Sequence, residues 1–446
     1  MQATMPLCAR AVDTPPSVDV YGADFTQQYT ELTKQILLAS IDLERFSLNY
    51  RLKSAAQPKY RRLRFFLAQE TGAACGLAFQ TVAIKQFAVG RRRPLKISKP
   101  ALHGALATIM TGSIIAGSDS CLELGLNGLL ALKHRQEGFD PASAKSYVCD
   151  KLQQIDQLLA KRDALVQSHP DHPGYSRAVL EGKVLAELRK SFINEFATFN
   201  ADSKGYTAFI NTFFLLNAAT NAVASTAAGL AYKGVNTPKF NGPTNILFMV
   251  TGAMIMASPL VSTLVGGLVH KHSYYSFLDR VGGEPKFDTS VLATARRQLT
   301  DKVQAEGSLV PSLPAVDRFA LYSESGALFR KQIINESTTM RHLEKVAVES
   351  NLLGPIIGGT LLTQGILGTT GYYRYTFRPR KQLALDYRGA IVGCTGSSLA
   401  TVGTAAWYLA SLAYENHLRK KHSLPAQLIE DRLAHIDDIE KIIRAM

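Results

Sequence analysis

The chain alternates long stretches that lack charge with stretches that are rich in it. Segments without any Asp, Glu, Lys or Arg, each at least 23 residues long, are 207–232, 245–269, 351–373 and 389–414. Segment 100–118 is slightly shorter, and segment 65–84 is apolar apart from Glu70 and two glutamines. Because a helix needs about 20 apolar residues to cross a bilayer core, the pattern predicts an all-α, polytopic membrane protein with about six transmembrane helices.

The predicted spans are rich in Gly, Ala, Ser and Thr, the residues that let helix backbones approach closely inside lipid. Small residues recur at a spacing of four at Gly72 and Gly76, Ala218 and Ala222, and Gly389 and Gly393. The alternative is a soluble protein whose core helices are buried and rich in alanine. We prefer the membrane interpretation because the uncharged stretches are separated by strongly charged ones.

The predicted spans come in pairs joined by short connections, whereas longer segments separate the pairs. Breaker clusters, SHPDHPG at 168–174 and GSLVPSLP at 307–314, divide each longer segment into two helices. The predicted order of segments is an N-terminal tail and extension helix at 1–64, a first membrane hairpin at 65–132, a two-helix extension at 133–206, a second hairpin at 207–269, a second two-helix extension at 270–350, a third hairpin at 351–414, and a C-terminal extension helix at 415–446 that pairs with the N-terminal one.

Short sequence words recur at matching places in this order. RKSFINE at 189–195 precedes the second hairpin, and RKQIINE at 330–336 precedes the third, 141 residues later. ERFSLNY at 44–50 holds the same place before the first. The alignment brings three asparagines into register, and we interpret them as repeat-contact residues: Asn49, Asn194 and Asn335.

The C-terminus repeats a second word. CDKLQQIDQL at 149–158 resembles EDRLAHIDDI at 430–439, so the helix that follows the first hairpin reappears after the last one. The chain is therefore predicted to be a pseudo-threefold repeat of a membrane hairpin plus a two-helix extension, with the third extension assembled from both ends of the chain. Chance similarity between short helical words is the alternative.

The extension helices are amphipathic. Apolar residues recur at helical spacing in two sets, Val148, Leu152, Ile155 and Leu159, and Ile429, Leu433, Ile436 and Ile443. Each set predicts a helix with one buried apolar stripe and one solvent-exposed face. We expect these extensions on one side of the membrane, as a head that offers a surface to partner proteins, although an ordinary solvated face also explains the charges.

Charge and composition narrow the class of partner. Of 446 residues, 46% are hydrophobic and 19% charged, and the net charge is +14. Much of the basic excess flanks the predicted spans, where a basic residue near an anionic leaflet contributes about 1 kcal/mol. Anionic headgroups or an acidic partner are the predicted contacts of Arg91, Arg92, Arg93, Arg378, Arg380 and Lys381. Nucleic acid is not predicted as a partner, because no basic platform interleaved with aromatic residues occurs.

The orientation follows from two opposing signals. The short connections between paired spans hold many basic residues and one acid, Asp386, which favours a cytoplasmic location for them. The opposite side carries the run Lys59, Arg61, Arg62 and Arg64, the run Arg419, Lys420 and Lys421, and both termini. Since the N-terminal stretch has no apolar signal-peptide core, we expect the termini and extensions on the cytoplasmic side of a plasma, inner or organellar membrane.

No catalytic, cofactor or metal motif stands out. The chain has no phosphate-binding loop, no nucleophile elbow and no dinucleotide fingerprint after a strand. The cysteines are scattered without a C-x-x-C pair, and four histidines near span exits, His134, His270, His272 and His417, lie in different registers. We therefore predict a protein that is not an enzyme and that has no cofactor or metal.

The best candidate site lies in the second predicted span. Asp119 and Glu123 are four residues apart, and Asn127 is one turn further, so the three share a helix face. Ionisable residues at membrane depth usually mark ion or proton paths, and Glu70 on the first span could join them. The alternative, which we prefer, is that the pair stands where a long helix leaves the lipid. Asn211, Asn217 and Asn221 form a further stripe, which we interpret as hydrogen-bonding contacts between helices.

Two functions of different class fit these observations. The first is a structural, scaffold or complex-assembly subunit without catalytic chemistry, whose helical head docks other membrane or cytoplasmic proteins. The alternative is a transporter or channel for a small solute, ion or proton that uses the intramembrane carboxylates. The first is preferred because four of the predicted spans carry no charge. The sequence leaves the oligomeric state open.

Overall fold

The computed structural model describes residues 20–55, 59–282, 289–306 and 353–445. Within these ranges 93% of the residues are helical and there is no strand, so the predicted all-α class is confirmed. Asn335 and the breaker cluster at 307–314 lie outside the described residues.

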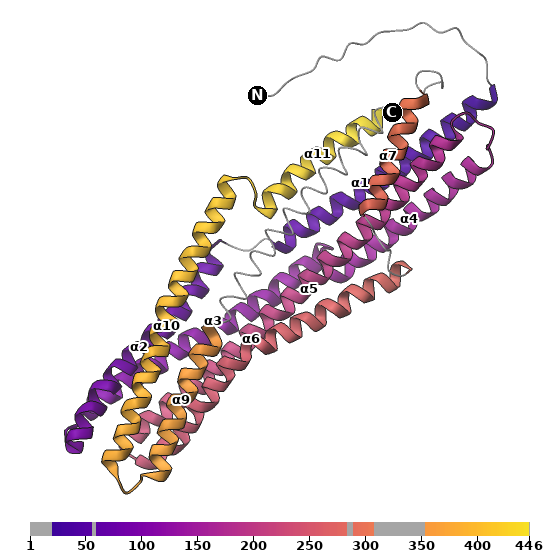
Figure 1. The fold of residues 1–446 in the computed structure, drawn as a ribbon. Helices are drawn as coiled ribbons and strands as arrows, with labels where there is room; N and C mark the ends of the chain where they lie inside the picture. Colours follow the sequence, from indigo (N-terminus) through magenta and orange to yellow (C-terminus); the bar gives the residue numbers. More distant parts are fainter. Residues whose placement is uncertain (1–19, 56–58, 283–288, 307–352, 446) are drawn as a thin grey trace.

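The α-helices follow one another along the chain (Figure 1). Their bounds are α1 Val20–Ala55, α2 Lys59–Arg92, α3 Lys99–Gln136, α4 Pro141–Gln167, α5 Tyr175–Gly234, α6 Asn241–Leu278, α7 Thr289–Glu306, α9 Leu353–Arg374, α10 Pro379–Lys420 and α11 Pro425–Ala445. Three short 3₁₀ turns adjoin these helices among the described residues. Pro94–Lys96 follows α2, Pro238–Phe240 precedes α6, and Asp279–Val281 follows α6.

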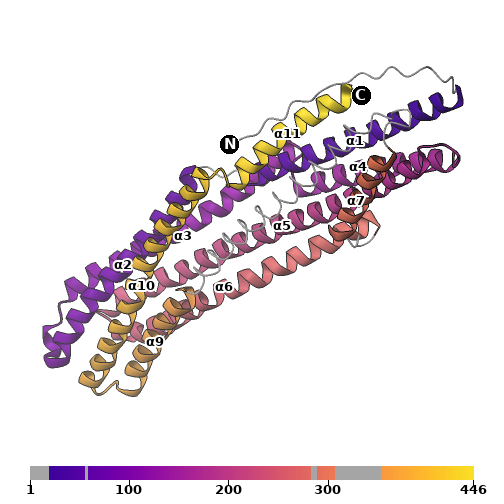
Figure 2. The ribbon, with the colours of Figure 1, turned by 45° about the horizontal axis from the view of Figure 1, so that its top comes forward.

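The molecule is an elongated bundle, as Figures 1 and 2 both show. One end is formed by α2, α9 and α10 with the neighbouring parts of α3, α5 and α6. The other end is formed by α1, α4, α7 and α11 around the first half of α5. We call the second end the head.

Six helices close into a ring of packed neighbours. Helix α2 packs on α3, α3 on α5, α5 on α6, α6 on α9, α9 on α10, and α10 again on α2. Around the ring, contacts between two helices joined by a short turn therefore alternate with contacts between helices of neighbouring hairpins. Every helix of the ring has a partner on each side.

Glycines set the spacing in this ring. A Cβ added to Gly358 of α9 would lie 2.6 Å from the carbonyl oxygen of Gly252 of α6. One added to Gly205 of α5 would lie 3.0 Å from the carbonyl oxygen of Gly266 of α6. Such distances leave no room for a side chain, so the backbones touch through glycine, as helices packed within a membrane commonly do.

Three helical stretches are long and apolar enough to cross a membrane: Lys99–Gln167, Tyr175–Gly234 and Pro238–Val281. They contain the predicted spans 100–118, 207–232 and 245–269. Their apolar side chains also face outward: Leu260, Leu264 and Leu268 of α6 are 66%, 66% and 68% exposed. An apolar stripe of this kind on the outer surface fits contact with lipid better than contact with water.

The three other predicted spans lie in α2, α9 and α10. Among the described helices these do not reach the same apolar level, so the number of spans is not fixed at six. The cause is visible in their sequences. Gln, Gly, Thr and Tyr interrupt the apolar residues of α9, and Gln69, Glu70 and Gln80 do so in α2.

The head has its own apolar core. Val148, Leu152 and Ile155 of α4 and Ile436 and Ile443 of α11 are nearly inaccessible to solvent, and they pack with residues of α1 in one cluster. The predicted amphipathic stripes are therefore confirmed. Helix α11 packs along α1, which brings the described ends of the chain side by side (Figures 1 and 2).

Long helices connect the head to the ring without a break. Helix α5 has 60 residues and runs through the expected segment boundary at 206/207, and α3 and α6 likewise run through the boundaries at 132/133 and 269/270. The apolar and amphipathic patterns succeed one another with no turn between them in these three helices. The break expected at 168–174 is present, because α4 ends at Gln167 and α5 begins at Tyr175.

Candidate functional site

Buried polar residues gather where α2, α3 and α5 meet. Asp119 and Glu123 lie on the same face of α3, with 8% and 2% of their surfaces exposed. Their four-residue spacing puts both side chains toward α2. We call this group and its partners the polar seam: Arg61, Arg64, Gln69, Asp119, Ser120, Glu123, Asn127, Asn211 and Asn217.

Two arginines of α2 pair with the two carboxylates. Arg64 Nε lies 2.9 Å from Asp119 Oδ1, and the Arg64 guanidinium also donates a hydrogen bond to Glu123. Arg61 donates hydrogen bonds to the Glu123 carboxylate and to Asn127 Oδ1. Two positive charges thus face two negative ones, which is the arrangement that burial of charge requires. The site residues Asp119, Glu123 and Asn127 are brought together.

The sequence did not reveal the two arginines as partners. Arg61 and Arg64 belong to a basic run expected at the membrane surface, whereas the structure turns them inward toward α3. Arg61 and Arg64 are three residues apart and therefore share a face of α2, but the sequence does not indicate which helix that face meets. One carboxylate oxygen, Asp119 Oδ2, is buried without a hydrogen-bond partner among the described residues.

Neutral side chains extend the polar seam toward α5. Asn127 Nδ2 donates to Asn211 Oδ1 at 2.6 Å. Asn217 Nδ2 donates to Ser120 Oγ at 2.9 Å and to Gln69 Oε1 at 3.0 Å. Amides that bond to one another across three helices hold those helices in register, which is the role we expected of the asparagine stripe.

Glu70 does not join the arginine and carboxylate pairs. It accepts a hydrogen bond from Thr404 Oγ1 on α10. A further polar contact involves α2, the helix of Glu70. Gln80 Nε2 donates to Gln364 Oε1 at 2.8 Å, and Gln364 Nε2 donates to Gln80 Oε1 at 3.2 Å. This reciprocal amide pair joins α2 to α9 and was not predicted, although Gln80 interrupts an apolar run.

Two of the three asparagines expected at repeat contacts, Asn49 and Asn194, lie on described helices of the head. Asn194 Oδ1 of α5 accepts a hydrogen bond from Tyr274 Oη of α6 at 3.3 Å, and Asn49 is half-buried on α1. Beside them, Arg51 of α1 forms an ion pair with Glu195 of α5. The residues next to these asparagines therefore tie α1 to α5.

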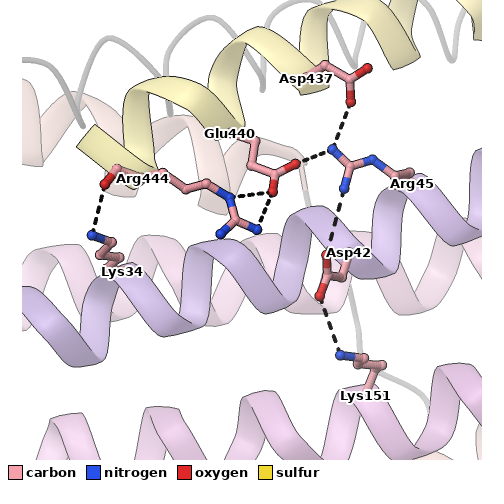
Figure 3. A network of polar contacts seen from close by, with 7 residues as sticks. All are labelled: Lys34, Asp42, Arg45, Lys151, Asp437, Glu440 and Arg444. Atoms are coloured by element: carbon pink, nitrogen blue, oxygen red, sulfur yellow. Dashed lines mark hydrogen bonds and ion pairs between the residues drawn. The ribbon is translucent and has the colours of Figure 1, made fainter. Parts of the chain in front are cut away.

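Charged residues join the two ends of the chain in the head (Figure 3). Arg45 of α1 pairs with Asp437 of α11 at 2.8 Å and with Glu440 of the same helix. Arg444 pairs with Glu440 at 2.6 Å. Hydrogen bonds from Arg45 and Arg444 hold the pKa of the Glu440 carboxyl below its usual range. The network fastens α11 to α1 by charge as well as by apolar contact.

The basic residues expected to contact anionic headgroups are exposed at the end of the ring farthest from the head. They are Arg91 and Arg92 at the end of α2, Arg93 directly after it, Arg378 directly before α10, and Arg380 and Lys381 at the start of α10. Within the described residues, no group of three or more His, Cys, Asp and Glu side chains could hold a metal ion.

The chain matches no protein-family model, no curated protein and no solved structure. The described part of the chain defines the class of protein: it is all-helical, and three of its helical stretches are long and apolar enough to cross a membrane.

Proposed function

We propose that the protein is an integral membrane scaffold. In this proposal the six ring helices cross the bilayer as three hairpins, and the head stands on one side of the membrane as a docking surface for partner proteins. The chain has no catalytic role in the proposal. The oily outer face of α6 and the glycine contacts between ring helices support the membrane location.

The pairing of Asp119 and Glu123 with two arginines is the observation that carries the proposal. A carboxylate on an ion path must exchange its partners as the ion passes. Removal of one partner from a buried ion pair costs about 3–5 kcal/mol, so the Arg61–Glu123 pair, in which both side chains are buried, resists exchange. The polar seam is suited to holding helices together, which is what a scaffold needs.

A pseudo-threefold organisation also belongs to the proposal. Successive hairpins of the ring contact one another in the order α3–α5, α6–α9 and α10–α2. In the head, α4 packs on α5 just as α11 packs on α1. These equivalences support three related units, the last of them completed by helices from opposite ends of the chain.

Cysteine labelling tests the crossing. In a variant that lacks the native cysteines, single cysteines replace Lys96, Asn236 or Phe377 at the hairpin turns and Gln154 in the head; all four positions are exposed. In sealed vesicles, a membrane-impermeant maleimide is expected to reach the three turn cysteines from one side and the head cysteine from the other. Labelling of all four from the same side would overturn the proposed topology.

Flux measurements distinguish a scaffold from a transporter. The transporter is favoured by Asp119 Oδ2, which is buried without a hydrogen-bond partner among the described residues. Vesicles that contain the purified protein and a pH-sensitive dye are expected to leak protons and cations no faster than protein-free vesicles. A flux that Asp119→Asn abolishes, with the fold intact and Glu415→Gln as an active control, would replace the scaffold by a transporter.

Cross-linking in native membranes tests the docking surface. Cross-links to a companion protein are expected from head lysines such as Lys161 and Lys183, which are exposed. Lys96 and Lys239 at the hairpin turns serve as the comparison, being exposed at the other end. Cross-links that arise mainly from the turn lysines would place the partner there and contradict a docking head.

A further inference from the structure

The three hairpin turns lie side by side at the end of the ring. Arg91, in the last turn of α2, lies with its guanidinium 4.8 Å from the ring centre of Tyr387 on α10. Asn236, between α5 and α6, is 3.3 Å from His103 Nε2 on α3. A Cβ added to Gly242 of α6 would lie 2.8 Å from the Tyr372 ring of α9. These contacts join all three turns into one surface, which we call the hairpin-tip surface.

The hairpin-tip surface is strongly basic. The segments 85–103, 231–244 and 374–388 contain many Lys and Arg residues and a single acid, Asp386. The basic side chains are exposed, including those of Arg92, Lys239 and Arg380. Asp386 is half-buried, and desolvation raises the pKa of its carboxyl to about 7. The acid therefore offsets little of the positive charge near neutral pH.

Aromatic rings stand among these cations. Phe377, in the turn between α9 and α10, is 96% exposed, and Tyr373 is 61% exposed. Rings of this kind favour the boundary between hydrocarbon and headgroups, where basic side chains also gain from anionic lipid. An almost fully exposed phenylalanine between Arg374 and Arg378 is disfavoured in water but suited to the edge of a bilayer.

The basic residues at the opposite end of the spans are differently engaged. Arg61 and Arg64 are paired with Glu123 of the polar seam, and Arg62 lies 3.1 Å from Glu415. Their charge is balanced within the protein. The basic side chains of the hairpin-tip surface are exposed and are therefore free to meet an external anion.

We infer that the hairpin-tip surface binds the headgroups of anionic phospholipids, with Phe377 inserted at the edge of the hydrocarbon. The inference rests on the proposed crossing of the membrane by the ring helices. Its consequence concerns orientation. Where the anionic leaflet is the cytoplasmic one, the head lies on the opposite side, the reverse of the orientation expected from the termini.

Matched variants of one helix test the inference. Arg378→Gln, Arg380→Gln and Lys381→Gln together remove three charges at the start of α10, and Arg419→Gln, Lys420→Gln and Lys421→Gln remove three exposed charges at its end. Native mass spectrometry of the protein in neutral detergent measures how many phosphatidylglycerol and phosphatidylcholine molecules are retained. We expect the first variant to lose preference for phosphatidylglycerol by about tenfold or more, and the second to keep it.

A tryptophan at the turn gives an independent reading. In Phe377→Trp, with the native Trp407 replaced by Phe, emission is expected to shift to shorter wavelength in vesicles that contain phosphatidylglycerol and to be quenched by brominated lipid. Inorganic phosphate is expected to leave both readings unchanged. If phosphate competes with the lipid, the surface binds the free anion, and the lipid assignment is wrong.

The two proposals fail in different ways. A chain that carbonate extracts from every vesicle, whatever its lipid, contradicts the crossing of the membrane. A chain that stays in vesicles of both compositions, but whose two triple variants retain phosphatidylglycerol equally, contradicts only the lipid surface. If both triple variants lose phosphatidylglycerol equally, the lipid surface is also contradicted, because the loss then follows the net charge of the protein and not the position of the removed charges.

Discussion

At the scale of single residues, the polar seam shows what spacing predicts and what it does not. The four-residue spacing of Asp119 and Glu123 placed them on one face of α3, and the structure puts them there. Their arginine partners were missed because contact between helices depends on how far one helix slides along another. That register is set by packing, here by contacts such as Gly72 against Ala116, and no local pattern encodes it.

Glu123 is expected to be far more important for stability than an exposed acid of the same kind. Glu123→Ala leaves Arg61 buried without its carboxylate, a change that costs about 3–5 kcal/mol. Glu415→Ala removes a partner of Arg62 that is 36% exposed and costs about 1 kcal/mol or less. Denaturant unfolding in detergent measures both, and equal losses would contradict a buried seam.

Asp386 is expected to make stability depend on pH in one direction. Its pKa is about 7 in the folded chain against 3.8 for the free side chain, so the folded state disfavours the ionised form. The penalty is absent below pH 3.8, grows between that value and about 7, and is complete above it. Asp386→Asn should raise the melting temperature at pH 8 and leave it unchanged near pH 3.5. A gain of equal size at both values would rule out titration as the cause.

At the scale of helices, periodicity and composition predicted most of what the structure contains. The amphipathic stripes of α4 and α11 are buried, and the break at 168–174 separates α4 from α5. The ends of the expected segments were less well placed, because α3, α5 and α6 continue from apolar into amphipathic sequence. Hydropathy changes at such a point, whereas helical hydrogen bonding does not.

Adjacent glycines of α9 are expected to respond differently to a side chain. A Cβ at Gly358 would meet the Gly252 carbonyl oxygen at 2.6 Å, whereas one at Gly359 would have no atom within 4 Å. Gly358→Leu should therefore separate α9 from α6, with a loss of about 1–3 kcal/mol or more, and Gly359→Leu should be tolerated. Melting temperature and size-exclusion profile in detergent report the difference; similar behaviour of the two variants would contradict the close packing.

At the scale of the whole molecule, the first and last described helices meet in the head. Similar words at 149–158 and 430–439 suggested that helices from both ends take part in one extension, and α11 does pack on α1. The network in Figure 3 was beyond reach from sequence, since charges on helices almost 400 positions apart have no detectable spacing. The threefold relation of the units remains a proposal that these contacts support.

Loss of the Arg45 contacts is expected to free α11. Arg45→Ala removes the link to Asp437 and Glu440, whereas Lys441→Ala breaks only an exposed pair with Asp438 inside α11. Trypsin should then cut after Lys420 or Lys421 and release α11 several-fold faster in the first variant than in the second. Equal release from the two variants would contradict the role of the network.

The unbroken length of α5 gives the protein a fixed reach. Its residues 175–206 precede the apolar run and, at 1.5 Å per residue, extend for about 48 Å along the helix. That length exceeds the roughly 30 Å thickness of the hydrocarbon itself. In the proposed crossing of the membrane, a partner bound at the turn between α4 and α5 would therefore be held at a set distance from the lipid.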